Sequence, residues 1–255
     1  MSGAEGLGPV LVTGAARRIG LALAKGFAEI GRPVILHASP RSLREATAAA
    51  GALRARGARA ETVAADLSDA LEAQGLIERA ESVFGPLTLL VNNASVFEPD
   101  GAEDFSLEVY ERQMAINLRA PLLLAQGFAA RLPPDAEGAI VNVIDQRVWR
   151  LTPHYFTYTL TKSALWAATR TMAQAFAPKI RVNAVGPGPV LPNEKLGKEE
   201  FAAEVAGVPL GRPADLSEVV DAVMFLARAR TVTGQMIAVD SGQHLAWRTP
   251  DVQPE

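Results

Sequence analysis

Short apolar runs alternate with longer segments of helical spacing along the whole chain. The short runs are bounded by glycine, proline or polar residues, and most of them are apolar at successive positions. Strands of this kind are typical of parallel sheets that helices cover on both faces. The predicted strands are residues 9–14, 33–39, 60–66, 87–95, 138–145, 180–188 and 234–242.

Between these strands, apolar residues recur every three or four positions, which is the spacing of an amphipathic helix. Ser106 is a candidate N-cap, Pro133 and Pro134 provide a stop, and Asp215 opens a D-x-x-E capping sequence. The predicted helices are residues 18–31, 41–56, 69–84, 106–131, 154–177 and 215–229.

This alternation predicts an α/β fold: a Rossmann-type, doubly wound parallel sheet of about seven strands with helices on both faces. We see no linker, repeat or low-complexity segment, so we expect a single domain over residues 1–255. The longest break in the pattern is residues 189–212, which hold several prolines and glycines. Long loops in compact domains are often lids, so this segment is the predicted substrate loop.

The composition narrows the functional classes. A net charge of −3 argues against nucleic acid or an anionic membrane as the main partner. No apolar run approaches the roughly 20 residues that span a bilayer, and the N-terminus lacks the basic and apolar regions of a signal peptide. The chain has no cysteine, and its three histidines lie far apart. We therefore expect a soluble, cytoplasmic protein without a metal.

The stretch "TGAARRIG" at residues 13–20 joins the first predicted strand to the first predicted helix. A glycine in such a turn lets the backbone approach a pyrophosphate, and the helix N-terminus offers unpaired N–H groups. The order Gly14, Arg18, Gly20 differs from the common G-x-G-x-x-G spacing. The position after the first strand of an alternating fold is therefore what predicts a dinucleotide site.

The region after the second strand indicates which dinucleotide binds. Sites for NAD usually place an acidic residue here to hold the ribose 2′-hydroxyl, and "HASPRSLR" has none. Ser39 and Arg41 lie here instead, and Arg17 lies in the glycine turn. A hydroxyl and cations suit a 2′-phosphate, so the sequence favours NADPH over NADH.

Tyr158 and Lys162 are four residues apart and fall on one face of a predicted helix. An ammonium group within about 4–6 Å of a phenol favours the phenolate. We therefore expect this pair to exchange a proton readily near neutral pH.

Six motifs occur in a distinctive order: "TGAARRIG", "AADL" at 64–67, "NNAS" at 92–95, Asn117, the Tyr158–Lys162 pair and "GPG" at 186–188. Over residues 9–245 this set resembles the short-chain dehydrogenase/reductase family. The resemblance implies one Rossmann domain, hydride transfer from a nicotinamide, and a homotetramer with helices 106–131 and 154–177 at an interface.

The resemblance also implies roles for individual residues. Tyr158 would donate the proton, Lys162 would lower its pKa and hold the nicotinamide ribose, and Asn117 would support a proton-relay water. Asp66 and Leu67 would contact the adenine. With the glycine turn and its neighbours included, the expected cofactor contacts are Gly14, Arg17, Arg18, Ile19, Gly20, Ser39, Arg41, Asp66, Leu67, Asn93, Ala94, Ser95, Tyr158, Lys162 and Gly188.

Asp145 departs from this family's pattern, because it stands thirteen residues before Tyr158, where the family usually has serine. A serine donates a hydrogen bond to a ketone oxygen as negative charge develops, whereas an ionised aspartate repels that charge. Asp145 is either neutral, with a pKa raised by burial, or ionised and accepting hydrogen bonds from substrate N–H groups. Both alternatives suit a nitrogen ring whose C=N bond is reduced.

Two further departures agree with this interpretation. Arg18 replaces a turn glycine, and "NNASVF" places Ser95 where the family commonly has glycine and Phe97 at the mouth of the site. The full set resembles the pteridine reductase branch and the bacterial dihydromonapterin (dihydrofolate-type) reductases. That likeness implies a pterin lying between Phe97 and the nicotinamide. The predicted substrate contacts are Arg18, Ser95, Phe97, Asp145 and Tyr158. Arg147 and Arg150 are the candidates for a cation that binds a folate tail at the rim, and the alternative is that both are solvated surface arginines.

Two alternatives remain open from the sequence. The first is a reductase of the same family that acts on an unrelated carbonyl compound. The second is a non-catalytic NADPH-binding scaffold, against which the intact Tyr158, Lys162 and Asn117 argue. The identity of the pterin side chain is also open at this point.

Overall fold

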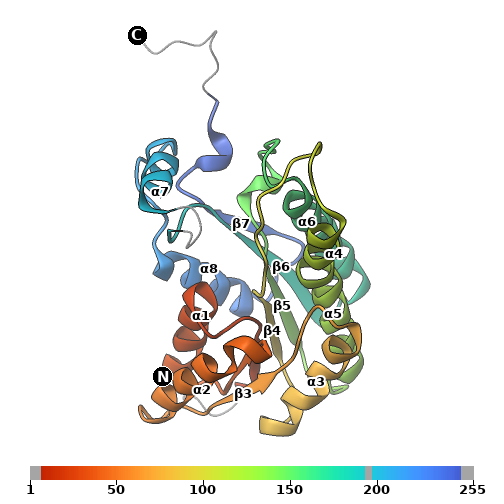
Figure 1. Ribbon diagram of the computed structural model, residues 1–255. Coiled ribbons are helices and arrows are strands. Elements are labelled where there is room, and N and C mark those ends of the chain that lie inside the picture. Colours follow the sequence, from red (N-terminus) through yellow and green to blue (C-terminus); the bar gives the residue numbers. More distant parts are fainter. Residues whose placement is uncertain (1–6, 193–196, 248–255) are drawn as a thin grey trace.

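The computed structural model describes residues 7–192 and 197–247 of the protein. All of its strands belong to one parallel sheet, in the order β3-β2-β1-β4-β5-β6-β7 (Figure 1). The predicted α/β class and Rossmann topology are therefore confirmed. The strands are β1 Val10–Val12, β2 Val34–Ala38, β3 Ala60–Ala64, β4 Leu89–Asn92, β5 Gly138–Val143, β6 Ile180–Pro187 and β7 Met236–Val239.

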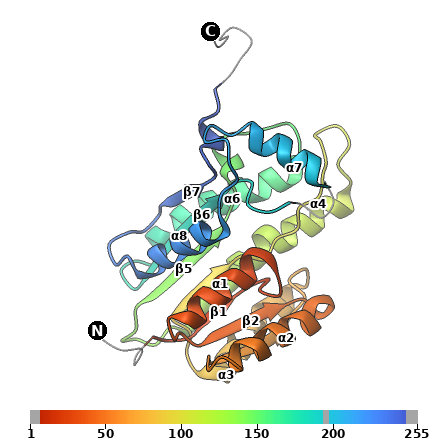
Figure 2. The same cartoon turned by 90° about the vertical axis from the view of Figure 1, so that its left-hand side faces the viewer.

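Helices cover both faces of this sheet. Figures 1 and 2 show α1, α2 and α8 on one face, and α3, α4, α5 and α6 on the other. The helices are α1 Arg18–Glu29, α2 Leu43–Arg54, α3 Ala70–Phe84, α4 Leu107–Met114, α5 Ala120–Arg131, α6 Phe156–Ala175, α7 Gly197–Ala206 and α8 Leu216–Arg228. Short 3₁₀ turns are η1 Pro40–Ser42, η3 Gln146–Val148 and η4 Gln243–Leu245.

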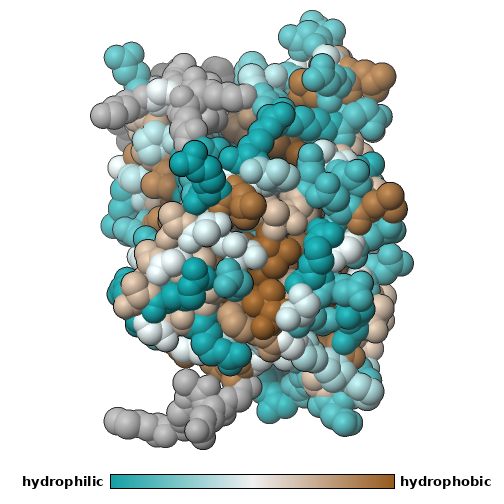
Figure 3. All heavy atoms as spheres, turned by 60° about the horizontal axis from the view of Figure 1, so that its bottom comes forward, coloured by the Kyte–Doolittle hydropathy of each residue, from teal (hydrophilic) through white to brown (hydrophobic). Residues whose placement is uncertain are grey.

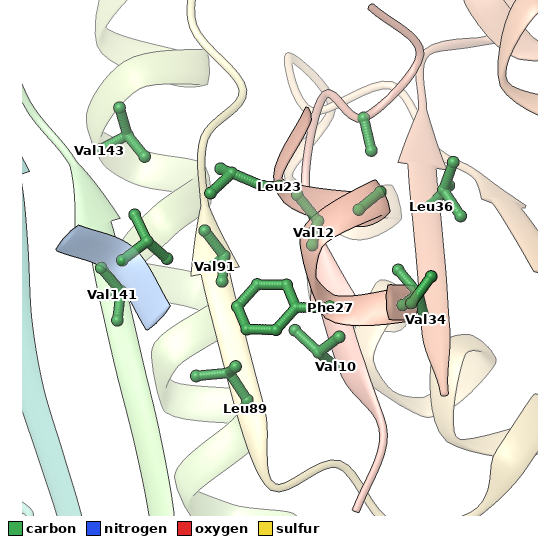
Figure 4. Packing of buried hydrophobic residues seen from close by; sticks show 14 of the residues in the cluster. Val10, Val12, Leu23, Phe27, Val34, Leu36, Leu89, Val91, Val141 and Val143 are labelled. Atoms are coloured by element: carbon green, nitrogen blue, oxygen red, sulfur yellow. The ribbon is translucent and has the colours of Figure 1, made fainter. Parts of the chain in front are cut away.

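The core consists of two apolar layers, one on each face of the sheet. Alternate residues of a strand point to opposite faces, so Val10 and Val12 lie in one layer and Leu11 in the other. Phe27 of α1 is 1% exposed and packs among β1 and β4 residues (Figure 4). Full burial of such a side chain contributes about 1.5–3 kcal/mol, which anchors α1 and the turn before it.

The predicted helix 106–131 contains an irregularity that the apolar pattern did not reveal. A π-helical turn, Ala115–Arg119, lies between α4 and α5. Pro121 follows directly, and it lacks the N–H that would bond the Asn117 carbonyl in a regular α-helix. The helical spacing of apolar residues is nearly unchanged by one wider turn, whereas such turns are frequent at functional sites.

The predicted irregular segment 189–212 is wrong in part, because it contains the helix α7. Residues 193–196 of this segment lie outside the described residues. The helix is short, and among its residues from 201 on only Phe201, Glu204 and Val205 are even partly buried. The surrounding prolines and glycines hid this weak helical signal in the sequence.

The surface is mainly polar on the face drawn in Figure 3, where hydrophobic residues form a narrow strip between hydrophilic flanks. Within residues 7–192 and 197–247, no helix has the length and apolar character needed to cross a membrane.

Candidate active site

A crevice opens where the strand order reverses, between the carboxyl ends of β1 and β4. Gly14 has φ +64°, a conformation that favours glycine, and a Cβ at this position would lie 2.9 Å from Ala94 Cα. A Cβ on Gly20 would lie 2.2 Å from the Gly14 carbonyl oxygen. Asn93 Nδ2 donates to the carbonyls of Thr13 and Gly14, at 2.8 and 3.2 Å. The turn is therefore a tight backbone cradle at the switch point of the sheet, the usual place of a dinucleotide in such folds.

His37, at the end of β2, supports the glycine turn through its hydrogen bonds. Its Nδ1 accepts from the Gly14 N–H at 3.1 Å, which leaves the proton on Nε2, 3.1 Å from the Ala65 carbonyl. The ring is 2% exposed, and burial lowers the pKa of His37 to about 4. The neutral imidazole therefore links the first three strands beneath the turn.

Protein stability should fall in acid because of His37. The unfolded chain takes up a proton near pH 6.5 and the folded chain only near pH 4, so stability is lost as pH falls through this window. A single group with these two pKa values removes roughly 2 kcal/mol by pH 5. We expect His37→Asn, which keeps an acceptor for the Gly14 N–H, to be less stable at pH 7.5 and to lose less stability than the native protein between pH 7.5 and 5.

Urea unfolding at several pH values measures this difference between the two proteins. Equal slopes of unfolding free energy against pH would show that His37 is not the titrating group. His154, which is exposed, supplies the matched control, because His154→Asn should leave the native slope unchanged.

The residues expected at the adenosine end lie along the same edge of the sheet. Ser39 and Arg41 follow β2, with the Ser39 hydroxyl 3.1 Å from that of Ser42. Asp66 follows β3, and its carboxylate accepts from the Ser68 N–H and hydroxyl, which together lower the pKa of Asp66. Leu67 is buried in the core. These four residues therefore follow β2 and β3, the two strands at the end of the sheet farthest from β7.

A cavity of about 690 Å³ occupies the other part of this edge. Its walls include ten of the residues that the sequence predicted for the site: Arg17, Arg18, Ile19, Asn93, Ser95, Phe97, Asp145, Tyr158, Lys162 and Gly188. The predicted Gly14, Gly20, Ser39, Arg41, Asp66, Leu67, Ala94 and Asn117 do not line it. Many of the predicted site residues thus line one cavity, and the turn glycines and Asn117 lie behind the cavity wall.

Asp145 and Tyr158 form the chemical centre of this cavity. The Tyr158 hydroxyl donates to Asp145 Oδ2 at 2.9 Å, and Asp145 Oδ1 accepts from the Arg147 N–H at 2.8 Å. Burial raises the pKa of Asp145, although the Arg147 guanidinium, 3.9 Å from Oδ1, opposes this. The pair can therefore hold a proton on either oxygen, at the point where two strand ends and α6 meet.

The expected lowering of the Tyr158 pKa is wrong for this structure. Burial, followed by the Asp145 charge, raises the pKa of Tyr158 well above its ordinary value. Lys162 donates instead to the Val143 carbonyl at 2.9 Å, and burial lowers the pKa of Lys162 to about 8. Burial and the Asp145 charge outweigh the Arg147 guanidinium, which acts in the opposite direction on the pKa of Tyr158, so the phenol keeps its proton here.

Asn117 lies in the π turn and is completely buried. Its Oδ1 accepts from the Val96 N–H at 2.8 Å, and its Nδ2 donates to the Val96 carbonyl at 2.8 Å. The Ser95 hydroxyl donates to the same Oδ1 at 3.1 Å. Asn117 therefore clamps the backbone that carries Ser95 and Phe97, and it also reaches α6 through Thr161 Oγ1 at 3.3 Å.

Phe97 lies between two tyrosines. Its ring stacks on Tyr155 with centroids 4.0 Å apart and meets Tyr158 edge-on at 4.6 Å. The Arg147 guanidinium lies 5.6 Å from the Phe97 centroid and 5.0 Å from that of Tyr155. Phe97 lines the cavity and Tyr155 does not, so only the face away from Tyr155 is open to a flat ligand.

Arg18 adopts φ +53°, the left-handed conformation that its glycine counterpart in the resembled family would adopt without strain. Its guanidinium donates to the carbonyls of Leu191 and Pro192, at 3.3 and 2.8 Å. Arg18 therefore joins the glycine turn to the start of the substrate loop.

Sequence reasoning missed several residues of the cavity wall. Gln146 directly follows Asp145, and that adjacency was the available signal. Phe201 and Glu204 come from the unpredicted helix α7, and Gln243 comes from the η4 turn after the last strand. No local motif marks Phe201, Glu204 or Gln243, because only the tertiary fold brings them to the cavity that Asp145 lines.

Comparison with known proteins adds independent evidence. The family model described as enoyl-(acyl carrier protein) reductase matches residues 14–244. Among solved structures, FolM alternative dihydrofolate reductase 1 from Brucella suis in complex with NADP is 48% identical, with a TM-score of 0.93 over 98% of this chain and 99% of that one. The Brucella canis counterpart, complexed with NADP, is 47% identical with a TM-score of 0.91 over the same shares. An uncharacterized oxidoreductase of Methylorubrum extorquens is 38% identical over 91% of this chain and 96% of its own length.

Proposed function

Because the chain belongs to the short-chain dehydrogenase/reductase family, we propose that it is an NADPH-dependent reductase of dihydropterins. The substrate class is a dihydropterin, dihydromonapterin or dihydrofolate, reduced to its tetrahydro form. The observation that carries this proposal is the Asp145 carboxyl, 2.9 Å from the Tyr158 hydroxyl in the cavity, where a carbonyl reductase would need a neutral donor. Two NADP-bound relatives of nearly half-identical sequence, described as alternative dihydrofolate reductases, support it.

The residues present fit a dinucleotide. The close packing at Gly14 and Gly20 leaves backbone exposed at the N-terminus of α1, where phosphates bind in such folds. Arg17 and Arg18 add positive charge beside it, and Lys162 with Gly188 lines the inner end. Ser39 and Arg41 would hold the 2′-phosphate, while Asp66 and Leu67 would border the adenine. When bound, NADPH supplies the hydride for the reaction.

The side chains of the protein then transfer the proton that the reaction needs. Tyr158 retains its proton because its pKa is raised, and Asp145 accepts a hydrogen bond from it. A substrate nitrogen that enters this hydrogen bond receives the proton from Tyr158 or from protonated Asp145. Lys162 and Arg147 are the cations that stabilise the pair once the proton has left. Phe97 orients the flat ring, and Asn117 holds the Phe97 segment in place.

We also propose that the chain assembles as a homotetramer through the helices 106–131 and 154–177. Apolar side chains on this layer support an interface, since Leu107, Leu122 and Leu160 are exposed. Light scattering measures the mass directly, and a monomeric mass would contradict this part of the proposal.

The deciding experiment is NADPH oxidation with dihydromonapterin, dihydrobiopterin and dihydrofolate, beside a panel of ketones and aldehydes. We expect turnover of at least one dihydropterin with NADPH, and slower turnover with NADH. Turnover confined to the carbonyl panel would favour the rival carbonyl reductase. Tight NADPH binding without oxidation on either panel would favour a scaffold instead.

A further inference from the structure

Three polar residues without an assigned role line the end of the cavity beside β5 and β7: Gln146, Glu204 and Gln243. Gln146 begins η3 and Gln243 begins η4, and these two turns pack against each other. Glu204 lies on α7, one helical turn after Phe201, and both residues line the cavity while Ala202 and Ala203 face solvent. The three residues therefore come together from separate segments beside Asp145.

Two of these residues present acceptor atoms with no hydrogen-bond partner. Gln243 Nε2 donates to Glu204 Oε1 at 3.1 Å, which fixes the orientation of the amide. Gln243 Oε1 is then left buried, without a partner among the described residues. Gln146 is 4% exposed, and its Oε1 is also buried and unpartnered within the described chain. Buried acceptors of this kind are destabilising until a donor reaches them. Both side chains line the cavity, so rotation of either amide would bring its oxygen to a donor on a ligand there.

The charges of the cavity are separated along the edge of the sheet. Arg17 and Arg18 follow β1, and the glycine turn that holds them suits anionic phosphates. The end of the cavity beside β5 and β7 instead combines the Glu204 carboxylate with the Gln146 and Gln243 amides, and the Arg147 guanidinium at this end lies 3.9 Å from Asp145 Oδ1. A ligand group at this end gains hydrogen bonds if it carries O–H or N–H donors, and a carboxylate there meets a like charge.

We propose that Gln146, Glu204 and Gln243 form a subsite for the substrate's side chain, which they bind through its hydroxyl or amine donors. The same subsite disfavours an anionic side chain, because Glu204 would repel it. This inference rests on the proposed function, since it presupposes a pterin ring beside Asp145 and Tyr158. The three residues of this subsite are distinct from Asp145 and Tyr158, which transfer the proton.

Charge reversal at Glu204 tests the subsite. We measure kcat/KM for a dihydropterin with a neutral polyhydroxyl side chain and for dihydrofolate, whose glutamate tail is anionic. We expect Glu204→Lys to raise kcat/KM for dihydrofolate, relative to kcat/KM for the neutral substrate, by about tenfold or more. The anionic tail would then meet a positive charge at close range in place of a negative one. Glu199→Lys is the matched control, because Glu199 lies on the exposed side of α7 and should leave the ratio as in the native protein.

Removal of the unpartnered acceptors provides a second test, and its Gln146→Leu arm does not depend on Glu204. Gln146→Leu should leave thermal stability equal or higher, because a buried unsatisfied oxygen is lost, whereas Gln243→Leu also loses its hydrogen bond to Glu204 Oε1 and should be less stable. Both should nevertheless lower kcat/KM for the polyhydroxyl substrate several-fold more than for a pterin without a side chain. A structural role alone would instead affect both substrates equally.

The outcomes separate this inference from the proposed function. Pterin turnover by the native enzyme, with an unchanged substrate ratio in Glu204→Lys and in both leucine variants, overturns the subsite alone. No turnover of any pterin by the native enzyme overturns the proposed function and the subsite with it.

Discussion

Replacing Tyr158 with phenylalanine is expected to lower kcat for a dihydropterin by about 10²–10⁴-fold, the usual contribution of a positioned acid–base group. The substitution removes only the hydroxyl that donates to Asp145 at 2.9 Å. It keeps the ring that meets Phe97 edge-on and lies 5.6 Å from Lys162 Nζ. We therefore expect NADPH affinity and the cavity shape to stay nearly unchanged.

Steady-state kinetics and NADPH titration of the same preparation measure the two expectations separately. Tyr110→Phe is the matched control, because Tyr110 lies on α4 away from the cavity wall and should retain native turnover. A Tyr158→Phe enzyme with native kcat would mean that another group donates the proton, and Asp145 would then be the remaining candidate.

Tyr158, Lys162 and Asp145 line one cavity, as expected for residues that belong to one strand–turn–helix unit. The hydrogen bond between Tyr158 and Asp145 follows from that local geometry. The direction of the Tyr158 pKa shift did not follow, since burial and the Asp145 charge raise this pKa by more than the Arg147 guanidinium lowers it. A sequence motif shows which ionisable groups are present. It does not determine whether burial or a neighbouring charge has the larger effect on their pKa values.

The fold was predictable for a similar reason, and its exceptions have physical causes. Continuously apolar strands and helices with regularly spaced apolar residues are strong sequence signals. The sheet contains seven such strands. The π turn at Asn117 alters a single hydrogen-bond register and leaves the apolar spacing almost intact. The stacking of Phe97 on Tyr155 joins a loop to the start of α6, so no sequence period could indicate it. Both features surround the site, where local rules are most often broken.

Replacing Asp145 with alanine is expected to lower kcat/KM for a dihydropterin by about 10²–10⁴-fold. Alanine removes the acceptor for the Tyr158 hydroxyl and for the Arg147 N–H, so it affects both the proton and the η3 turn. Asp145→Asn separates these effects, since an amide oxygen still accepts hydrogen bonds and the group no longer titrates. If the carboxyl serves as an acid or base, both variants should be impaired, whereas a purely structural role would spare the asparagine variant.

The pH profile of the native enzyme distinguishes the two protonation states of Asp145 that the sequence left open. Burial raises the pKa of Asp145. If the neutral acid is the active form, kcat/KM falls as pH rises through that raised pKa; if the carboxylate is active, kcat/KM falls as pH drops below it. Asp145→Asn should lose that limb of the profile, and Asp135→Ala, an exposed acid before β5, should keep it. Native dihydropterin turnover in Asp145→Ala, or gained ketone turnover in Asp145→Ser, would contradict the pterin assignment and favour a carbonyl substrate.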